Sequence, residues 1–221
     1  MGMVMGTIRE ETPQFKNHGA VAGLQCREYA PYWVAKISSD AYPELKTENE
    51  FMNTAFRSLA KYIGVFSTPQ NESRKQGSQE TIAMTAPVVM TSSEKIAMTA
   101  PVVMEESKTM SFILPSKYIE ASEEPPKPLD ARVRLEKIPG RVALVSTFSG
   151  FSSPEKARPH MKECVARIRE ASAVEFVIDE MTKEPKWEFF GYNPPFTLPW
   201  CRTNEVAIYL KEIPPALILA N

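Results

Sequence analysis

The order of strand-like and helix-like segments repeats within the chain, and this repeat restricts the possible folds more than any other feature. Residues 20–29 and 32–38 are rich in aliphatic and aromatic residues and predict two short strands separated by Ala30-Pro31. Residues 48–63 then carry apolar residues at helical spacing, which predicts a helix with a broad apolar face. Further strand-like segments follow as far as residue 114.

The second half of the chain shows the same order over residues 131–211. Alternating apolar and polar residues on both sides of Pro139-Gly140 predict a β-hairpin of residues 131–138 and 141–148. Ser153-Pro154 predicts the start of a second helix, with Pro159 moving its regular part further along the chain. The remaining strand-like segments are residues 174–178, 187–192 and 205–210.

Two such halves predict an α+β fold, in which a curled antiparallel sheet or partial barrel of two pseudo-symmetric halves carries two packed helices. The 221 residues suit a single domain. We expect this domain at residues 20–212, between an N-terminal arm at residues 1–19 and a C-terminal tail at residues 213–221.

A segment of nine residues, 82–90, returns unchanged at residues 96–104, fourteen positions later. Two copies are too few for a solenoid, and each copy contains a proline, Pro87 or Pro101. Proline cannot donate a hydrogen bond within a sheet. We therefore interpret the copies as two irregular or edge strands joined by residues 91–95.

Charge and cysteine content narrow the class of partner. Lysine and arginine total 26 against 27 aspartates and glutamates, a formal charge of -1, so we expect no nucleic acid partner. The cysteines, Cys26, Cys164 and Cys201, are odd in number and widely spaced, which favours a reducing, cytoplasmic location. The N-terminus shows no targeting pattern, and the uncharged run at residues 213–221 is too short for a membrane span.

Residues with catalytic potential are few and form no recognisable constellation. His18 lies in the expected arm and His160 at the start of the second helix, with no catalytic or phosphate-binding motif around either. The cysteine spacing does not suit zinc. We therefore expect no enzyme, no catalytic residues and no resident metal ion. The 11 methionines and 11 phenylalanines suit either a pocket for a flat apolar ligand or ordinary core packing.

Several short motifs, which together span about residues 20–211, resemble the SOUL family of haem-binding proteins. They are Arg27-Glu28-Tyr29, Lys61-Tyr62-Ile63-Gly64, the repeated Met-Thr-Ala-Pro-Val, Phe148-Ser149-Gly150-Phe151, and Gly191-Tyr192-Asn193-Pro194-Pro195 followed by Arg202-Thr203-Asn204-Glu205-Val206. The opening Met-Gly-Met-Val and the doubled segment most resemble the cytosolic plant members of the family.

This resemblance implies a protein that binds haem and related tetrapyrroles reversibly in an apolar groove beside the first helix, as a cytosolic carrier or buffer. The cofactor-binding residues that it implies are Phe56, Leu59, Ala60, Lys61, Tyr192, Pro194, Pro195 and Phe196. Lys61 either pairs with a haem propionate or is an ordinary solvated lysine of the helix. Both interpretations of Lys61 remain open.

Three positions depart from patterns found in some animal members of the family. Asn53 and Thr197 stand where those members carry basic residues, which weakens the case for a propionate clamp like theirs. Glu28 stands where one branch carries a histidine proposed as an axial ligand. Because a carboxylate is a poor substitute for imidazole on haem iron, that mode of ligation is not expected here.

Two other function classes remain open. In one animal relative the second helix is linked to protein binding, and the matching helix here has an apolar stripe, Met161, Cys164, Val165 and Ile168. The alternative function is thus a protein–protein interaction module without a haem role, provided that this stripe is exposed. The third class is an enzyme acting on a tetrapyrrole, for which no acid–base pair is evident.

The expected partners are a tetrapyrrole and, as a candidate, a protein of the tetrapyrrole pathway.

Replacing both histidines, His18→Ala with His160→Ala, is expected to leave the affinity for haemin within about threefold, well below the tenfold change that about 1.4 kcal/mol represents. The reason is that neither histidine lies in the proposed groove. Titration with haemin, followed by absorbance, measures the change. A loss of more than about tenfold would identify one histidine as an axial ligand.

Overall fold

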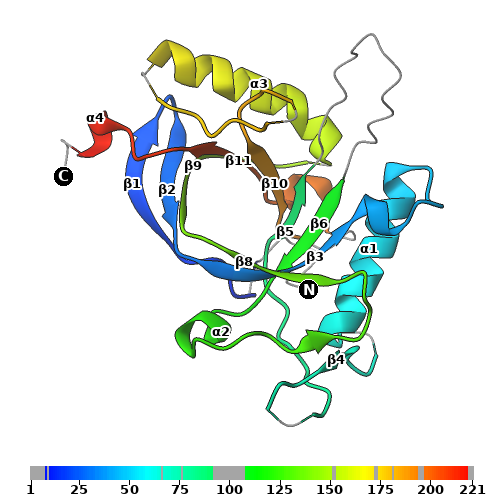
Figure 1. Ribbon diagram of the computed structural model, residues 1–221. Coiled ribbons are helices and arrows are strands. Elements are labelled where there is room, and N and C mark those ends of the chain that lie inside the picture. The colour runs from blue at the N-terminus through cyan, green and yellow to red at the C-terminus, as the bar shows by residue number, and fades with distance from the viewer. Residues whose placement is uncertain are drawn as a thin grey trace.

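The protein is shown in Figure 1 as a computed structural model, which describes residues 8, 10–65, 67–75, 77–91, 108–150, 153–171, 174–180, 182–193 and 197–218. Within these residues, nine strands form one curled antiparallel sheet in the order β1-β2-β9-β11-β10-β5-β6-β3-β8. The strands are β1 (Phe15–Val21), β2 (Leu24–Tyr29), β3 (Tyr32–Ser38), β5 (Val88–Thr91), β6 (Thr109–Ile113), β8 (Arg134–Ile138), β9 (Arg141–Phe148), β10 (Trp187–Gly191) and β11 (Asn204–Leu210). The predicted α+β class with a curled antiparallel sheet is confirmed.

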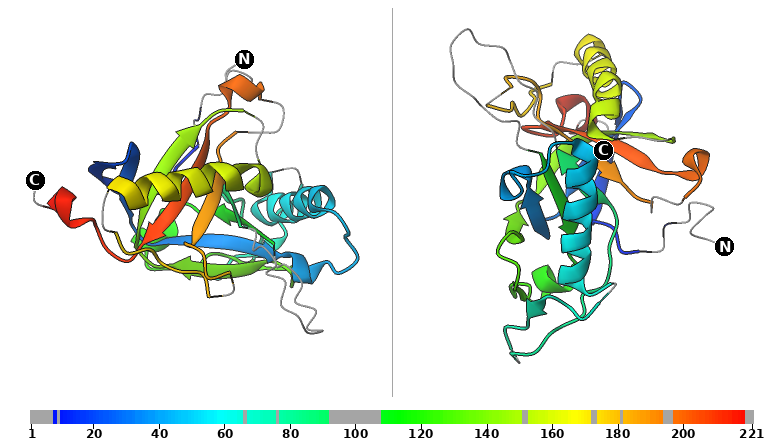
Figure 2. Two further views of the ribbon diagram at one scale, coloured as in Figure 1. Left: turned by 90° about the horizontal axis from the view of Figure 1, so that it is seen from above. Right: turned by 90° about the vertical axis from the view of Figure 1, so that its right-hand side faces the viewer.

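Two long helices lie on the outside of the curled sheet (Figure 2), as predicted. They are α1 (Glu48–Ile63) and α3 (Pro154–Ala171). Helix α1 begins with a capping box, in which the Thr47 hydroxyl accepts from Glu50 N and the Glu50 carboxylate accepts from Thr47 N. It ends at Gly64, whose φ of 85° is the left-handed conformation that glycine adopts without steric cost.

Smaller elements complete the described structure. They are the 3-10 helices η1 (Ser39–Ala41) and η2 (Pro199–Cys201), the short helices α2 (Lys117–Glu120) and α4 (Pro215–Ile218), and a two-stranded sheet of β4 (Asn71–Glu72) and β7 (Lys127–Pro128). The small sheet, which was not predicted from the sequence, pairs the loop after α1 with the proline-rich connection before β8.

The strand order shows the two halves of the chain directly. Read inward from one side, the sheet runs β2-β9-β11-β10, and read inward from the other side it runs β8-β3-β6-β5. The strands at the same place in the two series also correspond in their order along the two halves of the chain: β2 with β8, β9 with β3, β11 with β6, and β10 with β5. The predicted pseudo-symmetry therefore relates the two parts of the sheet by an approximate twofold axis between β10 and β5.

The predicted hairpin around Pro139-Gly140 is wrong, and the two strands that Ala30-Pro31 separates do not pair with each other either. Instead β2 pairs with β9, and β8 pairs with β3, so each half of the sheet contains one strand from the other half of the chain. A type I′ hairpin turn needs positive φ at both central residues, which proline cannot adopt. Both proline-containing corners therefore carry the chain across the sheet instead of folding it back.

Further sequence-based boundaries need correction. Part of the expected N-terminal arm forms the edge strand β1, which pairs with β2. Helix α3 begins at Pro154 and contains Pro159, so its regular part is not shifted. Residues 174–178 make isolated bridges at Phe176 and Ile178 and form no continuous strand.

The first copy of the duplicated segment is not an edge strand. Its last three residues lie in β5, which pairs with β10 on one side and β6 on the other. Pro87 precedes this strand and leaves its hydrogen bonds intact. The irregular conformation that we predicted is confined to residues 82–87. The second copy, residues 96–104, lies outside the described residues.

Three groups of buried side chains account for the packing. Helix α1 buries Phe51, Ala55 and Leu59 against the outer faces of β3 and β6, and α3 buries its own apolar face against β9, β10 and β11. The third group fills the inside of the curl and contains Tyr29, Tyr32, Val34, Val89, Ile113, Ala143, Val145, Phe190, Ala207 and Tyr209. Tyrosines thus contribute to the inner group and to the group under α1, whereas no tyrosine belongs to the buried group under α3.

The apolar stripe of α3 is part of this core. Met161, Cys164, Val165 and Ile168 are between 0% and 6% exposed. An interaction module that uses this stripe therefore lacks its surface in this fold.

No helix among the described residues is long and apolar enough to cross a membrane.

Deleting residues 91–104 is expected to leave a folded protein with one complete copy of the repeat. Strands β5 and β6 pair directly, so the remaining residues can close a shorter loop between Met90 and Met110. The deletion removes the hydrogen bond between the Thr91 and Thr109 hydroxyls, at a cost of about 1 kcal/mol. A chain of this length should then melt about 2–4 °C lower in circular dichroism. An unfolded or aggregated product would show that both copies are integral strands.

Candidate functional site

The inner face of the curled sheet carries two buried arginine–glutamate pairs. In the first, Arg27 on β2 donates from Nη1 and Nη2 to the two carboxylate oxygens of Glu205 on β11, each at 2.9 Å. Gln25 accepts from Arg27 Nε at 3.0 Å and from Nη2 at 2.7 Å. Tyr192 donates to Glu205 at 2.7 Å. All three nitrogens of the Arg27 guanidinium thus have acceptors, as a buried charge requires.

The second pair joins Arg141 on β9 to Glu188 on β10. Arg141 donates to Glu188 from Nη1 at 3.0 Å and from Nη2 at 2.7 Å, and Nη2 also donates to the Tyr32 hydroxyl. Tyr209 donates to Glu188 at 2.6 Å. Burial by itself raises the pKa of Glu188, but the charge of Arg141 and the hydrogen bonds from Arg141 and Tyr209 outweigh it and hold this pKa below its ordinary value.

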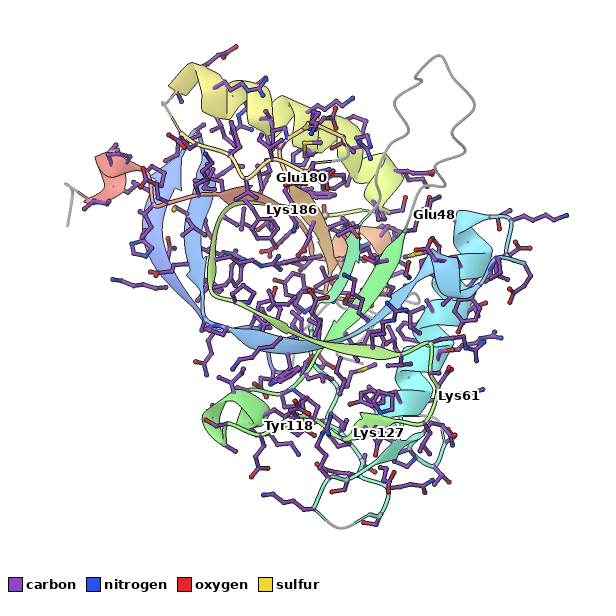
Figure 3. The ribbon with its side chains drawn as sticks, viewed as in Figure 1. Glu48, Lys61, Tyr118, Lys127, Glu180 and Lys186 are labelled. Carbon is purple, nitrogen blue, oxygen red and sulfur yellow. The ribbon has the colours of Figure 1, made fainter. Side chains whose placement is uncertain are left out.

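A separate concave region lies outside the sheet beside α1, and we call it the α1 cleft. It has a volume of about 660 Å³ and is lined by Ser58, Lys61, Ser67, Gln70, Leu129, Asp130, Ala131 and Arg132. Leu129 N donates to Gln70 O at 3.0 Å, which ties the segment after α1 to the connection before β8. Figure 3 shows Lys61 on the outer side of α1, pointing away from the sheet.

The α1 cleft is cationic and open to solvent. Within the described part of the chain, Lys61 makes no ion pair and is exposed. Arg132 donates from Nε to Asp130 at 2.9 Å and lies 4.7 Å from the centre of the Tyr42 ring. The hydrogen bond from Arg132 lowers the pKa of Asp130, and the nearby charge of Lys61 lowers it further. With one carboxylate beside two cations, the cleft favours an anionic group.

The four predicted helix residues do not share one surface. Lys61 lines the α1 cleft, whereas Leu59 and Ala60 are fully buried in the core beneath the helix. Phe56 is partly buried, with its ring edge against Phe112 at a centroid distance of 5.3 Å. The apolar periodicity of the helix therefore marks its core face, and only Lys61 of the four reaches the cleft.

The second predicted group is also divided. Tyr192 lies at the inner face of the sheet, bonded to Glu205, and does not line the α1 cleft. Pro194, Pro195 and Phe196 lie outside the described residues. The structure thus does not bring Tyr192 and Lys61 together.

Sequence reasoning missed the far wall of the α1 cleft, Leu129 to Arg132. These residues follow a proline-rich connection and belong to no periodic segment. The available signal was an aliphatic residue, Leu129, in an otherwise polar connection; in the structure its side chain is 52% exposed. Isolated exposed aliphatic residues are common, so this signal alone does not identify a site.

Potential iron ligands lie away from the α1 cleft. His18 bonds to Glu28 at 2.8 Å, and His160 is part of α3, with its ring nitrogen 3.0 Å from the Ser146 hydroxyl. The described residues contain no group of three or more histidine, cysteine and acidic side chains able to hold a metal ion. The described cleft lining offers lysine and arginine for haem propionates but no histidine, cysteine, methionine or tyrosine for iron. These residues fit a porphyrin held by its edge and faces.

Comparison with known proteins gives consistent matches over nearly the whole chain. The family model of the SOUL heme-binding protein matches residues 10–209. Heme-binding protein 2 of Homo sapiens is 32% identical over 208 residues, which cover 92% of this chain and 88% of that protein.

Two solved structures also match the chain. The C-terminal domain of EcmrR matches at 9% identity and a TM-score of 0.48, over 90% of this chain and 99% of that chain. A hydrolase encoded by lin2189 of Listeria innocua matches at 12% identity and a TM-score of 0.49, over 90% of this chain and 94% of that chain.

The described structure is an α+β domain of two similar halves with an open cationic cleft on its outer side. The sequence matches decide which family of such domains this is. The chain belongs to the SOUL heme-binding family. Membership of this family supports haem binding.

The substitution Arg141→Met is expected to destabilise the protein by about 3–5 kcal/mol at pH 7, because it leaves the carboxylate of Glu188 buried without its cation. The loss should be smaller at pH 4. In the wild type the pKa of Glu188 is lowered, so its contribution to stability is present above the ordinary value of 4.5 and is lost as pH falls. In the variant the charge and hydrogen bonds of Arg141 no longer offset burial, so this pKa rises and protonation relieves part of the penalty at low pH.

Urea unfolding at both pH values measures this difference. Lys36→Met is the matched control, because the Lys36–Glu136 pair on the same inner face is 37% and 50% exposed and should contribute less than about 1 kcal/mol. A destabilisation by Arg141→Met that is equal at pH 7 and pH 4 would contradict the assignment of the effect to Glu188.

Proposed function

We propose that the protein binds haem and related tetrapyrroles reversibly at the α1 cleft and acts as a cytosolic carrier or buffer. The observation that carries this proposal is the position of Lys61, an exposed lysine without an ion pair among the described residues, at the rim of a 660 Å³ cleft in a chain of the SOUL family. Cavities that bind small ligands and cofactors commonly measure about 300–1,000 Å³.

The propionates supply the charged part of the interaction. Lys61 and Arg132 are the two cations of the described lining, and they suit the two carboxylates of a haem edge. Arg132 is already bonded to Asp130, so Lys61 is the cation with more freedom to turn toward a ligand. Because Lys61 is exposed, its pair with a propionate should contribute only about 0–1 kcal/mol.

The porphyrin faces supply the larger part of the free energy. Leu129 is 52% exposed and lines the cleft together with Ala131 and the aliphatic part of Lys61. Covering apolar surface contributes about 25 cal/mol per Å², so a planar ligand that covers these side chains gains more than a single exposed ion pair provides. Phe56, Leu59 and Ala60 support this face from beneath, by fixing α1 against the sheet.

Reversible binding follows from the same openness. Most of the described cleft lining is exposed before any ligand binds, so binding and release need no opening of the core. A ligand held by its edge and faces, without a strong axial ligand, exchanges readily. These are the properties expected of a carrier or buffer.

Neither of the other function classes is favoured. The apolar stripe of α3 is buried, which removes the surface that an interaction module would use. For an enzyme, the α1 cleft offers Asp130, but Arg132 lowers its pKa and keeps it ionised, which makes it a weak general base. We therefore propose binding without catalysis.

The test is a haemin titration of two variants of the cleft. Leu129→Asp should weaken binding of both haemin and iron-free protoporphyrin by more than about tenfold, because it removes apolar contact and places a carboxylate beside the ligand's own carboxylates. Lys61→Ala should weaken binding by about two- to fivefold at low salt and much less in 1 M salt, where exposed charges are screened.

Matched controls separate the cleft from the rest of the surface. Ile178→Asp replaces an aliphatic side chain that is 45% exposed and lies away from the cleft lining, and Lys137→Ala removes a lysine on β8. Both should bind haemin as the wild type does. If folded Leu129→Asp binds both ligands normally, the α1 cleft is not the site; if it loses haemin alone, iron ligation dominates.

A further inference from the structure

The inside of the curled sheet contains a second cavity, which we call the inner pocket. Its volume is about 350 Å³. Strands β3, β5, β6 and β8 form its floor, the Arg141–Glu188 pair lies at one end, and the segment around Lys186 forms the opposite wall. Figure 3 shows Lys186 in the upper part of the ring formed by the strands, remote from Lys61. The haem site proposed above lies on the other side of the sheet and does not use this pocket.

The polar end of the inner pocket has more hydrogen-bond donors than acceptors. Arg141 Nε is buried and has no acceptor among the described residues. The Tyr32 hydroxyl accepts from Arg141 but meets no acceptor of its own within the described chain. Burial raises the pKa of Tyr32, so this hydroxyl keeps its proton. Two donors therefore lie at this end of the pocket without acceptors.

The first arginine–glutamate pair shows what a completed network looks like. Gln25 accepts from Arg27 Nε at 3.0 Å, and the corresponding nitrogen of Arg141 has no such partner in the described structure. A buried donor without an acceptor is unfavourable. An oxygen brought by a ligand would remove this cost at the inner pocket, whereas every guanidinium nitrogen of Arg27 already has an acceptor.

The charges of the inner pocket are balanced. Its lining contains four cationic and four acidic side chains, Lys36, Arg141, Arg158, Lys186, Glu136, Asp179, Glu184 and Glu188. Three ion pairs join them, Lys36–Glu136, Arg158–Glu184 and Arg141–Glu188. A ligand with a net charge of either sign would meet a like charge beside each of these three pairs. A neutral ligand avoids this repulsion.

The uncharged lining combines four hydroxyl side chains, Thr91, Thr109, Ser111 and Thr182, with a smaller apolar group. Val34, Val89 and Ile138 project from three different strands into the inner pocket. Val34 and Val89 belong to the buried group that fills the curl. These three side chains form an apolar part of a mainly polar lining.

We propose that the inner pocket is a second ligand site, separate from the α1 cleft, for a compact neutral molecule with an apolar body and a carbonyl-type oxygen. The body lies between Val34, Val89 and Ile138. The oxygen accepts from Arg141 Nε or the Tyr32 hydroxyl and completes the network around Glu188.

Three probes of matched size test the charge preference on the full chain: benzamide, benzoate and benzylammonium. The protein is labelled with ¹⁵N and titrated with each, following the Nε–Hε cross-peak of Arg141 and, in a methyl-labelled sample, contacts from the ring to Val34, Val89 and Ile138. Benzamide should bind at least about fivefold more tightly than either charged probe, shift the Arg141 cross-peak, and show contacts to the three aliphatic side chains.

A pair of variants on β8 tests the location. Glu136→Trp places a large side chain at the inner pocket, and Lys137→Trp makes the same change at the next residue, which lies outside the pocket lining. Since β8 is at the edge of the sheet and both residues are exposed, both variants should fold. Glu136→Trp should weaken benzamide binding by at least about tenfold, and Lys137→Trp by less than about twofold.

Several results would overturn the proposal. They are no binding of benzamide, equal or tighter binding of a charged probe, an unchanged Arg141 cross-peak at saturation, or normal benzamide binding by folded Glu136→Trp. Should Glu136→Trp not fold, the ring contacts in the wild type decide alone. Haemin titration of Glu136→Trp separates the two sites: unchanged haemin affinity is expected, and a parallel loss of haemin would show that there is one site and not two.

Discussion

The exchange of strands between the two halves of the chain is the constraint on which the rest of the structure depends. Because β2 pairs with β9 and β8 pairs with β3, neither half of the sheet is complete without the other half of the chain. The two corners that carry the chain across also meet: a Cβ at Gly140 would lie 3.2 Å from Tyr29 O and 3.7 Å from the Pro31 ring. The curl, its inner pocket and its two outer helix-binding faces therefore form together.

The curl divides the chemistry of the molecule into an inside and an outside. Inside, each arginine has a carboxylate partner from another strand, because an unpaired charge in this environment would cost several kcal/mol. Outside, the α1 cleft holds two cations and one carboxylate in an exposed setting, where an uncompensated charge costs little. An anionic ligand is therefore better suited to the outside, and a neutral one to the inside.

Some of this was predictable from the sequence, and the rest was not, for physical reasons. Periodicity predicted α1, because Phe51, Ala55 and Leu59 recur on its core face, whereas the family resemblance placed Leu59 and Ala60 in a ligand groove. The apolar pattern reports burial and does not distinguish core from cleft. The strand exchange was missed because alternation around a proline corner fits a hairpin equally well until its pairing partner is known. Leu129 and Arg132 were missed because the pairing of β4 with β7 brings their loop to α1.

The two arginine–glutamate pairs lie on the same side of the sheet, β2-β9-β11-β10, and show how ion pairs of similar design can have different surroundings. Each pair lies on the inner face and each is bidentate, but Gln25 completes the Arg27 network, whereas Arg141 Nε remains without an acceptor in the described structure. Glu205 receives bonds from Tyr192 and Thr147, and Tyr29 accepts from Arg27, so every guanidinium nitrogen of Arg27 and both oxygens of Glu205 are hydrogen-bonded. The Arg141 end faces a 350 Å³ cavity. The acceptor Gln25 is present beside Arg27, and no counterpart lies beside Arg141 in the described structure. This one difference distinguishes a completed structural network from the one that we propose receives a ligand.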